Sequence, residues 1–289
     1  MQKCRKLPPW IRVKINCGTN RNEIAHLMDE LKLHSVCASA QCPNLGECWH
    51  RGTATFMILG DECTRNCKFC AVSHNPHPAP PDPAEVKNLV EAVKRMKLKY
   101  VVITCVTRDD LEDGGAGQFA AIINELHKET PETGIEVLTS DFNNNIAALK
   151  TVLDAGPTVF NHNVETVRRM AAKIRDKATY DRSMQVLRNA FELTKGKIPV
   201  KSGFMVGLGE NDNEVLETLE ELRENKVSIV TIGQYLPPSG AHWKLDRYVE
   251  PEKFDEWAKF AKKIGFESVA SAPLVRSSYN AEELLQKNK

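Results

Sequence analysis

Apolar runs and amphipathic segments alternate along the chain after residue 52. The apolar runs are short and nearly continuous, which is typical of strands that are buried on both faces of a parallel sheet. Six strands are therefore expected, at Ala54–Leu59, Tyr100–Val106, Ile135–Thr139, Thr158–Asn161, Val200–Leu208 and Ile229–Leu236.

The segments between these strands place apolar residues three and four positions apart, the spacing that forms one buried face of a helix. Asn211 or Asp212 can cap one of these helices, because both side chains accept hydrogen bonds from the free N–H groups of a first helical turn. Four helices are expected with defined bounds, at Pro83–Met96, Arg182–Leu193, Asn211–Arg223 and Pro251–Ile264.

Six strand–helix units predict an α/β fold in which helices cover a parallel sheet. A closed barrel of this kind has eight units. The expected architecture is therefore a partial (β/α)6 TIM-like barrel that stays open on one side, with a doubly wound sheet as the structural alternative. In either fold the active site is built from the carboxyl ends of the strands.

The composition is that of an ordinary globular enzyme, with 42% hydrophobic and 27% charged residues. The formal net charge of +1 argues against a protein that mainly neutralises nucleic-acid phosphates. No apolar run approaches the roughly 20 residues that cross a bilayer, and the first residues lack the apolar stretch of a secretory signal. We therefore expect a cytoplasmic protein without nucleic-acid or membrane partners, unless an organellar targeting peptide has been removed.

Six of the nine cysteines form two triplets: the first is Cys37-x4-Cys42-x5-Cys48, and the second is Cys63-x3-Cys67-x2-Cys70. Three thiolates hold a soft metal centre but leave a four-coordinate one incomplete, so each triplet predicts a metal site with one open position. The odd number of cysteines and the missing signal peptide disfavour disulfides. Zinc is the alternative, but its sites usually gather four cysteine or histidine ligands, so the triplets favour iron–sulfur clusters.

The second triplet follows the first predicted strand, so the loop 63–70 lies at the carboxyl end of that strand. A cluster held there faces the mouth of the predicted barrel, where active sites of parallel α/β folds are built. Phe69 lies between the second and third cysteines and can shield such a cluster from water.

The loop Cys63-Thr-Arg-Asn-Cys67-Lys-Phe-Cys70 resembles the CxxxCxxC signature of radical S-adenosylmethionine enzymes. Together with the first triplet, the chain resembles the lipoyl synthase family over nearly its whole length, from about Trp10 to Tyr279. The stretches that carry this resemblance are Cys42–Trp49, Gly52–Asp61, Arg108–Leu111, Val137–Phe142, Phe160–Asn163, Lys201–Gly203, Gly233–Leu236 and Arg276–Tyr279.

This resemblance implies a sulfurtransferase with two 4Fe–4S clusters that uses S-adenosylmethionine. The cluster of Cys63, Cys67 and Cys70 is expected to split S-adenosylmethionine into methionine and a 5′-deoxyadenosyl radical. The radical abstracts hydrogen from an octanoyl chain, and the auxiliary cluster donates sulfur to its sixth and eighth carbons. The implied partners are octanoylated lipoyl-carrier domains, such as the glycine cleavage carrier protein or 2-oxoacid dehydrogenase E2 subunits, and an electron donor such as flavodoxin or ferredoxin.

The resemblance also implies the ligands of the auxiliary cluster: Cys37, Cys42, Cys48 and a serine of the terminal motif, assigned to Ser278 and expected to act in catalysis. A hydroxyl is a harder ligand than a thiolate and leaves iron more readily, which suits a cluster that surrenders sulfide. Without the resemblance, Ser277 and Ser278 are better interpreted as caps of a helix that begins at Asn280. The expected division is an N-terminal extension at 1–52, a radical S-adenosylmethionine barrel at 53–270 and a C-terminal extension at 271–289.

Three further residues are expected to bind S-adenosylmethionine. Asn163 and Glu165 follow the fourth strand and match a segment that contacts the nucleoside in the similar biotin synthases. Thr104 ends the second strand, where the superfamily usually binds the methionine amino group. The alternative for Glu165 is a favourable charge at a helix N-terminus, and His162 is expected to be a buried, hydrogen-bonded side chain.

Three other functions compete with this interpretation. A biotin synthase is the enzyme alternative, but the first triplet and Arg276–Tyr279 argue against it. An iron–sulfur electron carrier needs a fourth cysteine for each cluster, and a zinc-dependent nucleic-acid module is expected to be more basic. The basic run 168–177 is either a surface for an acidic carrier or a solvated face.

Overall fold

The structure is a computed structural model that describes residues 7–11, 19–39, 42, 44, 45, 48, 55–278, 281 and 282. Its centre is an eight-stranded sheet in the order β1-β2-β5-β6-β7-β8-β9-β10, in which every pair is parallel except β1 with β2. The strands are β1 His34–Ser35, β2 Thr55–Ile58, β5 Tyr100–Cys105, β6 Gly134–Leu138, β7 Val159–Asn161, β8 Val200–Val206, β9 Ile229–Gln234 and β10 Ser268–Ser271. Two further strands, β3 Glu62–Cys63 and β4 Ser73–His74, pair only with each other.

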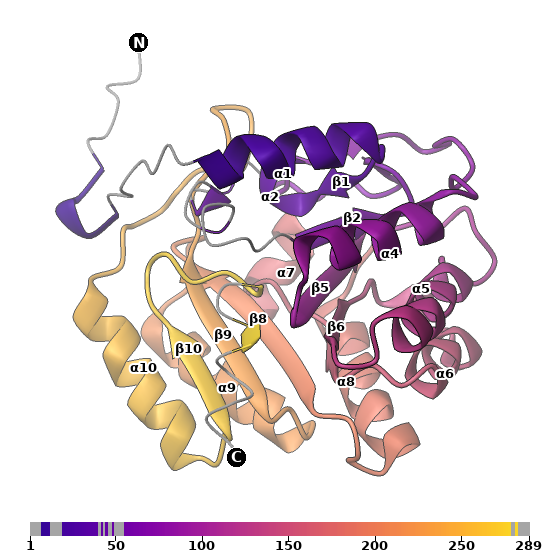
Figure 1. Cartoon of the computed structure of the whole chain (residues 1–289). Coiled ribbons are helices and arrows are strands. Elements are labelled where there is room, and N and C mark those ends of the chain that lie inside the picture. Colours follow the sequence, from indigo (N-terminus) through magenta and orange to yellow (C-terminus); the bar gives the residue numbers. More distant parts are fainter. Residues whose placement is uncertain are drawn as a thin grey trace.

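Helices cover the outer face of this curved sheet (Figure 1). The helices that follow the strands are α4 Glu85–Met96, α5 Ala116–Glu129, α6 Ile146–Asp154, α7 Arg168–Ile174, α8 Tyr180–Thr194, α9 Asp212–Glu224 and α10 Pro251–Lys263. The N-terminal part adds α1 Thr19–Glu30 and α2 Val36–Ser39, and short 3-10 turns lie at η1 Pro9–Ile11 and η2 Phe142–Asn144. No helix of the described part is long and apolar enough to span a membrane.

The partial barrel predicted from the apolar pattern is confirmed, and each of the six predicted strands corresponds to a strand of the sheet. Asn211 is the N-cap of α9: its side-chain oxygen accepts a hydrogen bond from the Glu214 backbone N–H at 3.0 Å, and the Glu214 carboxylate reaches back to the Asn211 N–H at 2.9 Å. This reciprocal capping box satisfies two free donors of the first turn.

The sheet extends beyond the six predicted strands at both edges. β10 adds four residues parallel to β9, and β1 adds two residues antiparallel to β2. Both segments are too short, and the Ser-Val-Ala-Ser sequence of β10 too polar, to form a recognisable apolar run. These strands join the N-terminal and C-terminal parts of the chain to the same sheet.

A buried polar layer lies inside the barrel below the strand ends. The Lys201 ammonium donates to both carboxylate oxygens of Glu136, at 2.8 and 3.0 Å, and both side chains are only 1% exposed. Asn161 and the Tyr100 hydroxyl also donate to this carboxylate, at 2.9 and 3.1 Å. Because side chains two residues apart on a strand share a face, this layer lies directly beneath residues such as Leu138 and Gly203.

Candidate functional site

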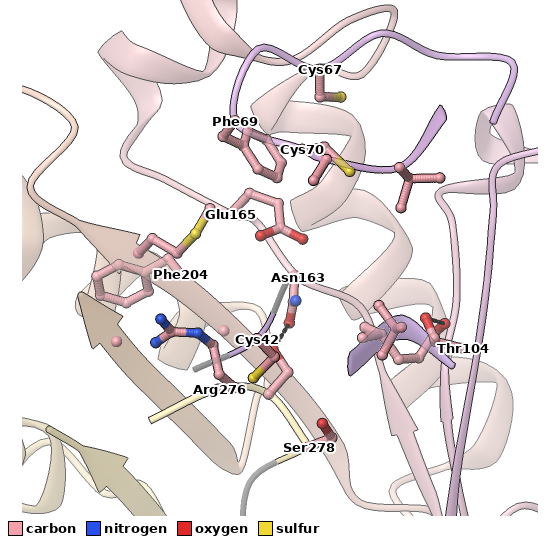
Figure 2. A pocket seen from close by; sticks show the side chains of 18 of the residues that line it. Cys42, Cys67, Phe69, Cys70, Thr104, Asn163, Glu165, Phe204, Arg276 and Ser278 are labelled. Carbon is pink, nitrogen blue, oxygen red and sulfur yellow. Dashed lines mark hydrogen bonds between the residues drawn. The ribbon is translucent and has the colours of Figure 1, made fainter. Parts of the chain in front are cut away.

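A cavity of about 490 Å³ opens at the carboxyl ends of the parallel strands and is lined by residues from β2, β5, β6, β8 and β9. It also receives residues from the N-terminal part, from the loop 63–72 and from the C-terminal segment. The predicted cluster ligands on its wall are Cys37, Cys42, Cys63, Cys67, Cys70 and Ser278. Figure 2 shows Cys67 and Cys70 on one side of this space and Cys42 and Ser278 on the other.

The loop that carries the second triplet starts at a fixed turn after β2. Leu59 and Gly60 both have positive φ, at 69° and 90°, so the chain leaves the strand sharply. The Glu85 carboxylate accepts the Leu59 N–H at 3.0 and 3.1 Å, and Arg108 donates to the Leu59 carbonyl at 3.1 Å. Because the left-handed region is costly for Leu, these buried contacts hold the start of the loop in place.

Two sulfur atoms of this triplet accept hydrogen bonds from backbone N–H groups. The Cys63 sulfur accepts from the Arg65 N–H at 3.4 Å, and the Cys67 sulfur accepts from the Asp176 N–H at 3.3 Å. Burial raises the pKa of the Cys70 thiol to about 12 and also raises the pKa of Cys67. Such thiols stay protonated until a metal displaces the proton, whereas the N–H groups stabilise the thiolates once metal has bound.

Arg65, inside the second triplet, anchors the loop to the ends of two strands. Its guanidinium forms two hydrogen bonds with Asp109, both 2.8 Å, and one of 2.6 Å with Asp141. Its side chain is 4% exposed. Burial by itself would lower the pKa of Arg65, but hydrogen bonds to the two carboxylates outweigh burial and raise it, so the guanidinium is permanently charged.

The segment after β9 closes over the outer side of the same loop. His242 Nε2 lies 3.1 Å from the Cys70 carbonyl oxygen, and the Trp243 N–H donates to the Lys68 carbonyl at 2.8 Å. The Lys68 ammonium lies 5.5 Å from the centre of the Trp243 ring, within reach of a cation–π interaction. The loop is thereby held from both its inner and its outer side.

The first triplet reaches the same cavity through the N-terminal part. Cys37 and Cys42 line the cavity, while Cys48 is partly buried against the hydrophobic core. Burial, together with the nearby Cys37, raises the pKa of the Cys42 thiol. The buried Asn44 side chain donates to the Leu274 carbonyl at 2.6 Å, which ties this triplet to the C-terminal segment 230 residues away.

The C-terminal segment enters the barrel because two strand residues lack side chains. A Cβ at Gly233 would lie 2.2 Å from the Val275 carbonyl oxygen, and a Cβ at Gly203 would lie 3.0 Å from the Ser277 hydroxyl oxygen. The Ser277 hydroxyl donates to the Asn163 side-chain oxygen at 3.0 Å. These contacts place Ser278 on the cavity wall, where Figure 2 shows it below Asn163.

The three residues expected to bind S-adenosylmethionine all line this cavity. The Thr104 hydroxyl donates to the Leu138 carbonyl at 3.0 Å and so already has an acceptor. Glu165 has a positive φ of 66°, and burial raises the pKa of its carboxyl group. A strained backbone and a desolvated acid at one position are typical of functional sites. Glu165 precedes α7 by three residues, but its side chain lines the cavity.

His162 is buried and held between two partners, as expected. Its Nδ1 lies 2.9 Å from the Thr139 carbonyl oxygen, and its Nε2 lies 2.9 Å from the Ser183 hydroxyl, which in turn accepts from Arg175 at 2.8 Å. The carbonyl requires a donor at Nδ1, so Nε2 accepts from Ser183 and the ring is neutral. Burial accordingly lowers the pKa of His162 to about 4.

The basic run 168–177 is largely neutralised by neighbouring helices. Arg168 forms ion pairs with Asp181 and Glu221, and Arg169 forms one with Glu214. These contacts favour the solvated-face interpretation of the run over a surface that is free for an acidic carrier.

Two family models match the chain. The Radical SAM superfamily covers residues 57–222, and the N-terminal domain of lipoyl synthase covers residues 1–42. A lipoyl synthase of Alkaliphilus metalliredigens is 48% identical over 284 residues, which span 98% of this chain and 97% of the relative. This chain belongs to the lipoyl synthase family. Lipoyl synthases carry two 4Fe–4S clusters and use S-adenosylmethionine, so the predicted cofactors are confirmed at the level of the family.

Other lipoyl synthases match almost as extensively. The protein of Methylococcus capsulatus is 50% identical and covers 96% of this chain and 85% of its own. The chloroplastic lipoyl synthase of Arabidopsis thaliana is 46% identical and covers 98% of this chain and 73% of its own. The enzyme is therefore a radical S-adenosylmethionine sulfurtransferase, as the cysteine spacing and the terminal motif predicted.

Solved structures of more distant enzymes share the fold. Methylornithine synthase gives a TM-score of 0.56 at 15% identity, over 86% of this chain and 74% of its own. The FeFe-hydrogenase maturase HydG of Carboxydothermus hydrogenoformans gives 0.58 at 12% identity, over 93% of this chain and 79% of its own. These similarities support the partial barrel and carry no information about substrate.

The residues on the cavity wall fit two iron–sulfur clusters and a polar ligand. Soft thiols face the space from both triplets, and the buried Thr139 hydroxyl on the same wall has no hydrogen-bond partner in the described part of the chain. Within the described ranges, no three His, Cys, Asp or Glu side chains converge closely enough to hold a single metal ion.

Sequence reasoning did not single out Arg65 or Arg276, although both lie in quoted motifs. Arg65 falls between Cys63 and Cys67, and its partners Asp109 and Asp141 each follow a strand. The sequence therefore places the opposite charges of Arg65, Asp109 and Asp141 at neighbouring strand ends. This pattern could have indicated the ion pairs between them.

Proposed function

We propose that this chain inserts two sulfur atoms at the sixth and eighth carbons of an octanoyl group bound to a carrier domain. The observation that best supports this reaction is that thiols of both triplets line one cavity at the mouth of the barrel. A radical source and a sulfur source must reach the same alkyl carbons, and a shared cavity provides this geometry.

Cys63, Cys67 and Cys70 are proposed to hold the first cluster and to leave one iron for S-adenosylmethionine. The chemistry that the bound groups supply is reductive cleavage of S-adenosylmethionine, hydrogen abstraction from the octanoyl chain and transfer of sulfur from the auxiliary cluster. The protein's part is to fix the loop with Arg65 and with the segment around Trp243, so that the open position faces the cavity.

Cys37, Cys42, Cys48 and Ser278 are proposed to hold the auxiliary cluster. Cys42 and Ser278 line the cavity, and the Asn44–Leu274 hydrogen bond joins the two chain segments that supply these ligands. A hydroxyl ligand matches iron less well than a thiolate, so Ser278 suits a site that must open during catalysis.

The wall between the two cysteine sets is suited to an alkyl chain. Apolar side chains dominate it, including Met57, Phe69, Leu138, Phe204 and Leu236. Burial of an octanoyl chain against them is favourable by about 0.8 kcal/mol for each CH₂ group. The same side chains exclude water, which protects a reactive radical from side reactions.

Thr104, Asn163 and Glu165 are proposed to contact S-adenosylmethionine. Glu165 and Asn163 both face the cavity between Cys70 and Ser278 (Figure 2), and Asn163 favours the charged form of the Glu165 carboxyl group. A carboxylate beside an amide can accept from ribose hydroxyls, a common solution for nucleosides.

The proposed domain division is 1–52, 53–270 and 271–289, with both extensions contributing to the auxiliary site. Octanoylated carrier domains are the proposed substrates, and a flavodoxin or ferredoxin is the proposed electron donor. We propose the cytoplasm as the location, although plant relatives are named chloroplastic.

Iron analysis of the anaerobically reconstituted protein tests the cluster assignment. We expect roughly eight iron and eight sulfide per chain in the wild type, and about four in variants that replace either cysteine triplet by alanine. Conversion of an octanoylated carrier to the lipoylated form, followed by mass spectrometry, tests the reaction. Zinc without iron after oxygen-free loading, or no product from a fully loaded enzyme, would contradict the proposal.

Ser278→Ala tests the fourth ligand. We expect this variant to fold and to cleave S-adenosylmethionine, because the first cluster is untouched, but to hold the auxiliary cluster weakly and to form little lipoyl product. Ser271→Ala is a matched control, since Ser271 lies in the same terminal region and its hydroxyl bonds only to the Phe254 carbonyl at 2.8 Å. Normal lipoyl yield from Ser278→Ala would remove serine from the ligand set.

A further inference from the structure

The cavity contains a guanidinium group that pairs with no carboxylate of the described residues. Arg276 lines the cavity, and the acceptors of its Nη1 in this part of the chain are backbone carbonyls, at 2.6 Å to Val275 and 3.5 Å to Pro273. Within the described residues it forms no ion pair, whereas Arg65 on the same wall contacts two carboxylates. A buried charge without a counter-charge is costly, by several kcal/mol. The cavity is therefore suited to bind an anionic group next to Arg276.

The second unpaired guanidinium of the cavity, Arg175, has other compensation. It interacts electrostatically with the carboxylates of Glu165 and Asp141 and donates a hydrogen bond to Ser183. Among the described residues, the group that interacts electrostatically with Arg276 is Cys42, which is negative only once its raised pKa has been overcome, as on metal binding. Figure 2 accordingly shows the Arg276 side chain beside Cys42. Arg276 and two cysteines of the first triplet, Cys37 and Cys42, thus lie on the wall of the same cavity.

The backbone fixes the place of this guanidinium. The Gln234 N–H donates to the Pro273 carbonyl at 3.2 Å, and the Val275 N–H donates to the Ala272 carbonyl at 3.0 Å. A Cβ on Gly233 would come within 3.2 Å of the Arg276 Nη1 atom. Because Gly233 has no side chain, the Arg276 guanidinium can approach β9 this closely while Arg276 still lines the cavity.

We propose that Arg276 is a positioning residue of the auxiliary cluster, binding it by charge and by hydrogen bonds in addition to its covalent ligands. Three thiolates and an alkoxide outweigh the positive charge of a 4Fe–4S core, so the assembly is anionic. A guanidinium beside it offsets that charge and favours reduction, since hydrogen bonds and nearby charges set cluster potentials. It also retains the cluster when the weak Ser278 ligand detaches. This inference rests on the proposed ligand set.

Redox titration of the holoenzyme, followed by electron paramagnetic resonance, tests the proposal. The signal that S-adenosylmethionine perturbs belongs to the cluster of the loop 63–70, and the other signal belongs to the auxiliary cluster. In Arg276→Gln we expect only the auxiliary midpoint potential to become more negative. Arg276→Lys keeps the charge and should restore most of the potential, which a purely structural role would not require.

Loss of iron to a chelator supplies a second measurement. A charge-assisted hydrogen bond is worth about a tenfold change in equilibrium, so Arg276→Gln should release auxiliary iron about tenfold faster than the wild type. Arg175→Gln is the matched control: it removes another cavity guanidinium near Cys67, and we expect it to affect the other cluster.

The outcomes separate this inference from the proposed function. A wild-type protein with only four iron atoms would overturn the ligand set itself. Eight iron atoms with an unchanged auxiliary potential in Arg276→Gln would overturn the role of Arg276 alone. If that variant instead loses affinity for S-adenosylmethionine while the potential stays constant, the anion held by Arg276 is the carboxylate of S-adenosylmethionine and the proposal is wrong.

Discussion

The Ser277 hydroxyl donates a hydrogen bond to the Asn163 side chain across 114 residues of sequence. This contact joins the segment that carries Ser278 to the segment proposed to contact S-adenosylmethionine. Ser277→Ala removes the contact, and a hydrogen bond of about 1 kcal/mol corresponds to roughly fivefold weaker binding. We expect that loss in the dissociation constant of S-adenosylmethionine, measured by equilibrium dialysis.

The control is again Ser271→Ala, which removes a serine hydroxyl outside the cavity. Equal affinities of the wild type and Ser277→Ala would separate Asn163 from the nucleotide site. Equal losses in both serine variants would indicate a general effect on the terminal segment.

Arg65→Lys keeps a positive charge at the second triplet but loses the double hydrogen bond with Asp109. We expect the free energy of unfolding to fall by about 1–3 kcal/mol. We also expect iron to be lost selectively from the cluster of the loop 63–70, because the loop is no longer fixed to the strand ends. Iron content and abortive cleavage of S-adenosylmethionine measure this effect.

Arg108→Lys is the matched control for that variant. Arg108 is 1% exposed and forms the same double contact with Asp110, both bonds 2.8 Å, but it does not line the cavity. Arg108 also donates to the Leu59 carbonyl at the start of the loop. We therefore expect Arg108→Lys to destabilise the protein similarly but to lose less iron from the loop 63–70 than Arg65→Lys, because the contacts of Arg65 inside the loop remain. Equal cluster loss in the two variants would show that Arg65 contributes only to general stability.

Gly233→Ala tests whether the terminal segment must lie flat on β9. The added Cβ would lie 2.2 Å from the Val275 carbonyl oxygen, so the segment has to move, at a cost of about 1–3 kcal/mol. We expect less auxiliary iron and little lipoyl product, with cleavage of S-adenosylmethionine retained. At Gly240 a Cβ would meet nothing within 4 Å, and Gly240→Ala should behave as the wild type.

His162 should make the stability of the apo-protein depend on pH. Its pKa is about 4 in the folded chain and about 6.5 when unfolded, so the unfolded state binds the proton more readily. The contribution of His162 to the free energy of unfolding is fully present above pH 6.5 and falls as the pH drops. The loss levels off below pH 4 and totals about 3 kcal/mol. Urea midpoints between pH 7.5 and 5 measure this slope.

His162→Gln should flatten that slope, since glutamine does not titrate. An Asp141→Asn variant serves as a comparison. Burial by itself would raise the pKa of Asp141, but Arg65 lowers this pKa to about 2. Its contribution is lost only as the pH falls from about 4 towards 2, so it leaves the range above pH 5 unchanged. An identical slope in His162→Gln and the wild type would assign the dependence to other groups.

The regular elements could be predicted because each has a local cause in the sequence. The strand β5 is a nearly continuous apolar run, and α9 begins with an asparagine cap three residues before Glu214. The two cysteine triplets could likewise be recognised from the sequence, because a cluster requires fixed residue types at short spacing, and their role as ligands stays a prediction. The C-terminal serine was assigned only through the family resemblance, since a serine before a helix is usually a cap.

Other parts of the site depend on contacts between distant segments. The sequence near Asn44 does not indicate its hydrogen bond to Leu274. The sequence around Gly203 likewise does not indicate that Ser277 packs against this glycine. That Arg276 forms no ion pair with a described residue is likewise visible only in the folded chain. Periodicity and spacing describe one segment at a time, so such relationships require the folded chain.

The polar layer of Glu136, Asn161 and Lys201 limits how deep the barrel can receive a guest. A methylene tail entering from the mouth gains contact energy only until it meets this ion pair, where further advance would strip a charge of its partners. We therefore expect this polar layer to limit the depth to which an acyl chain can enter the barrel.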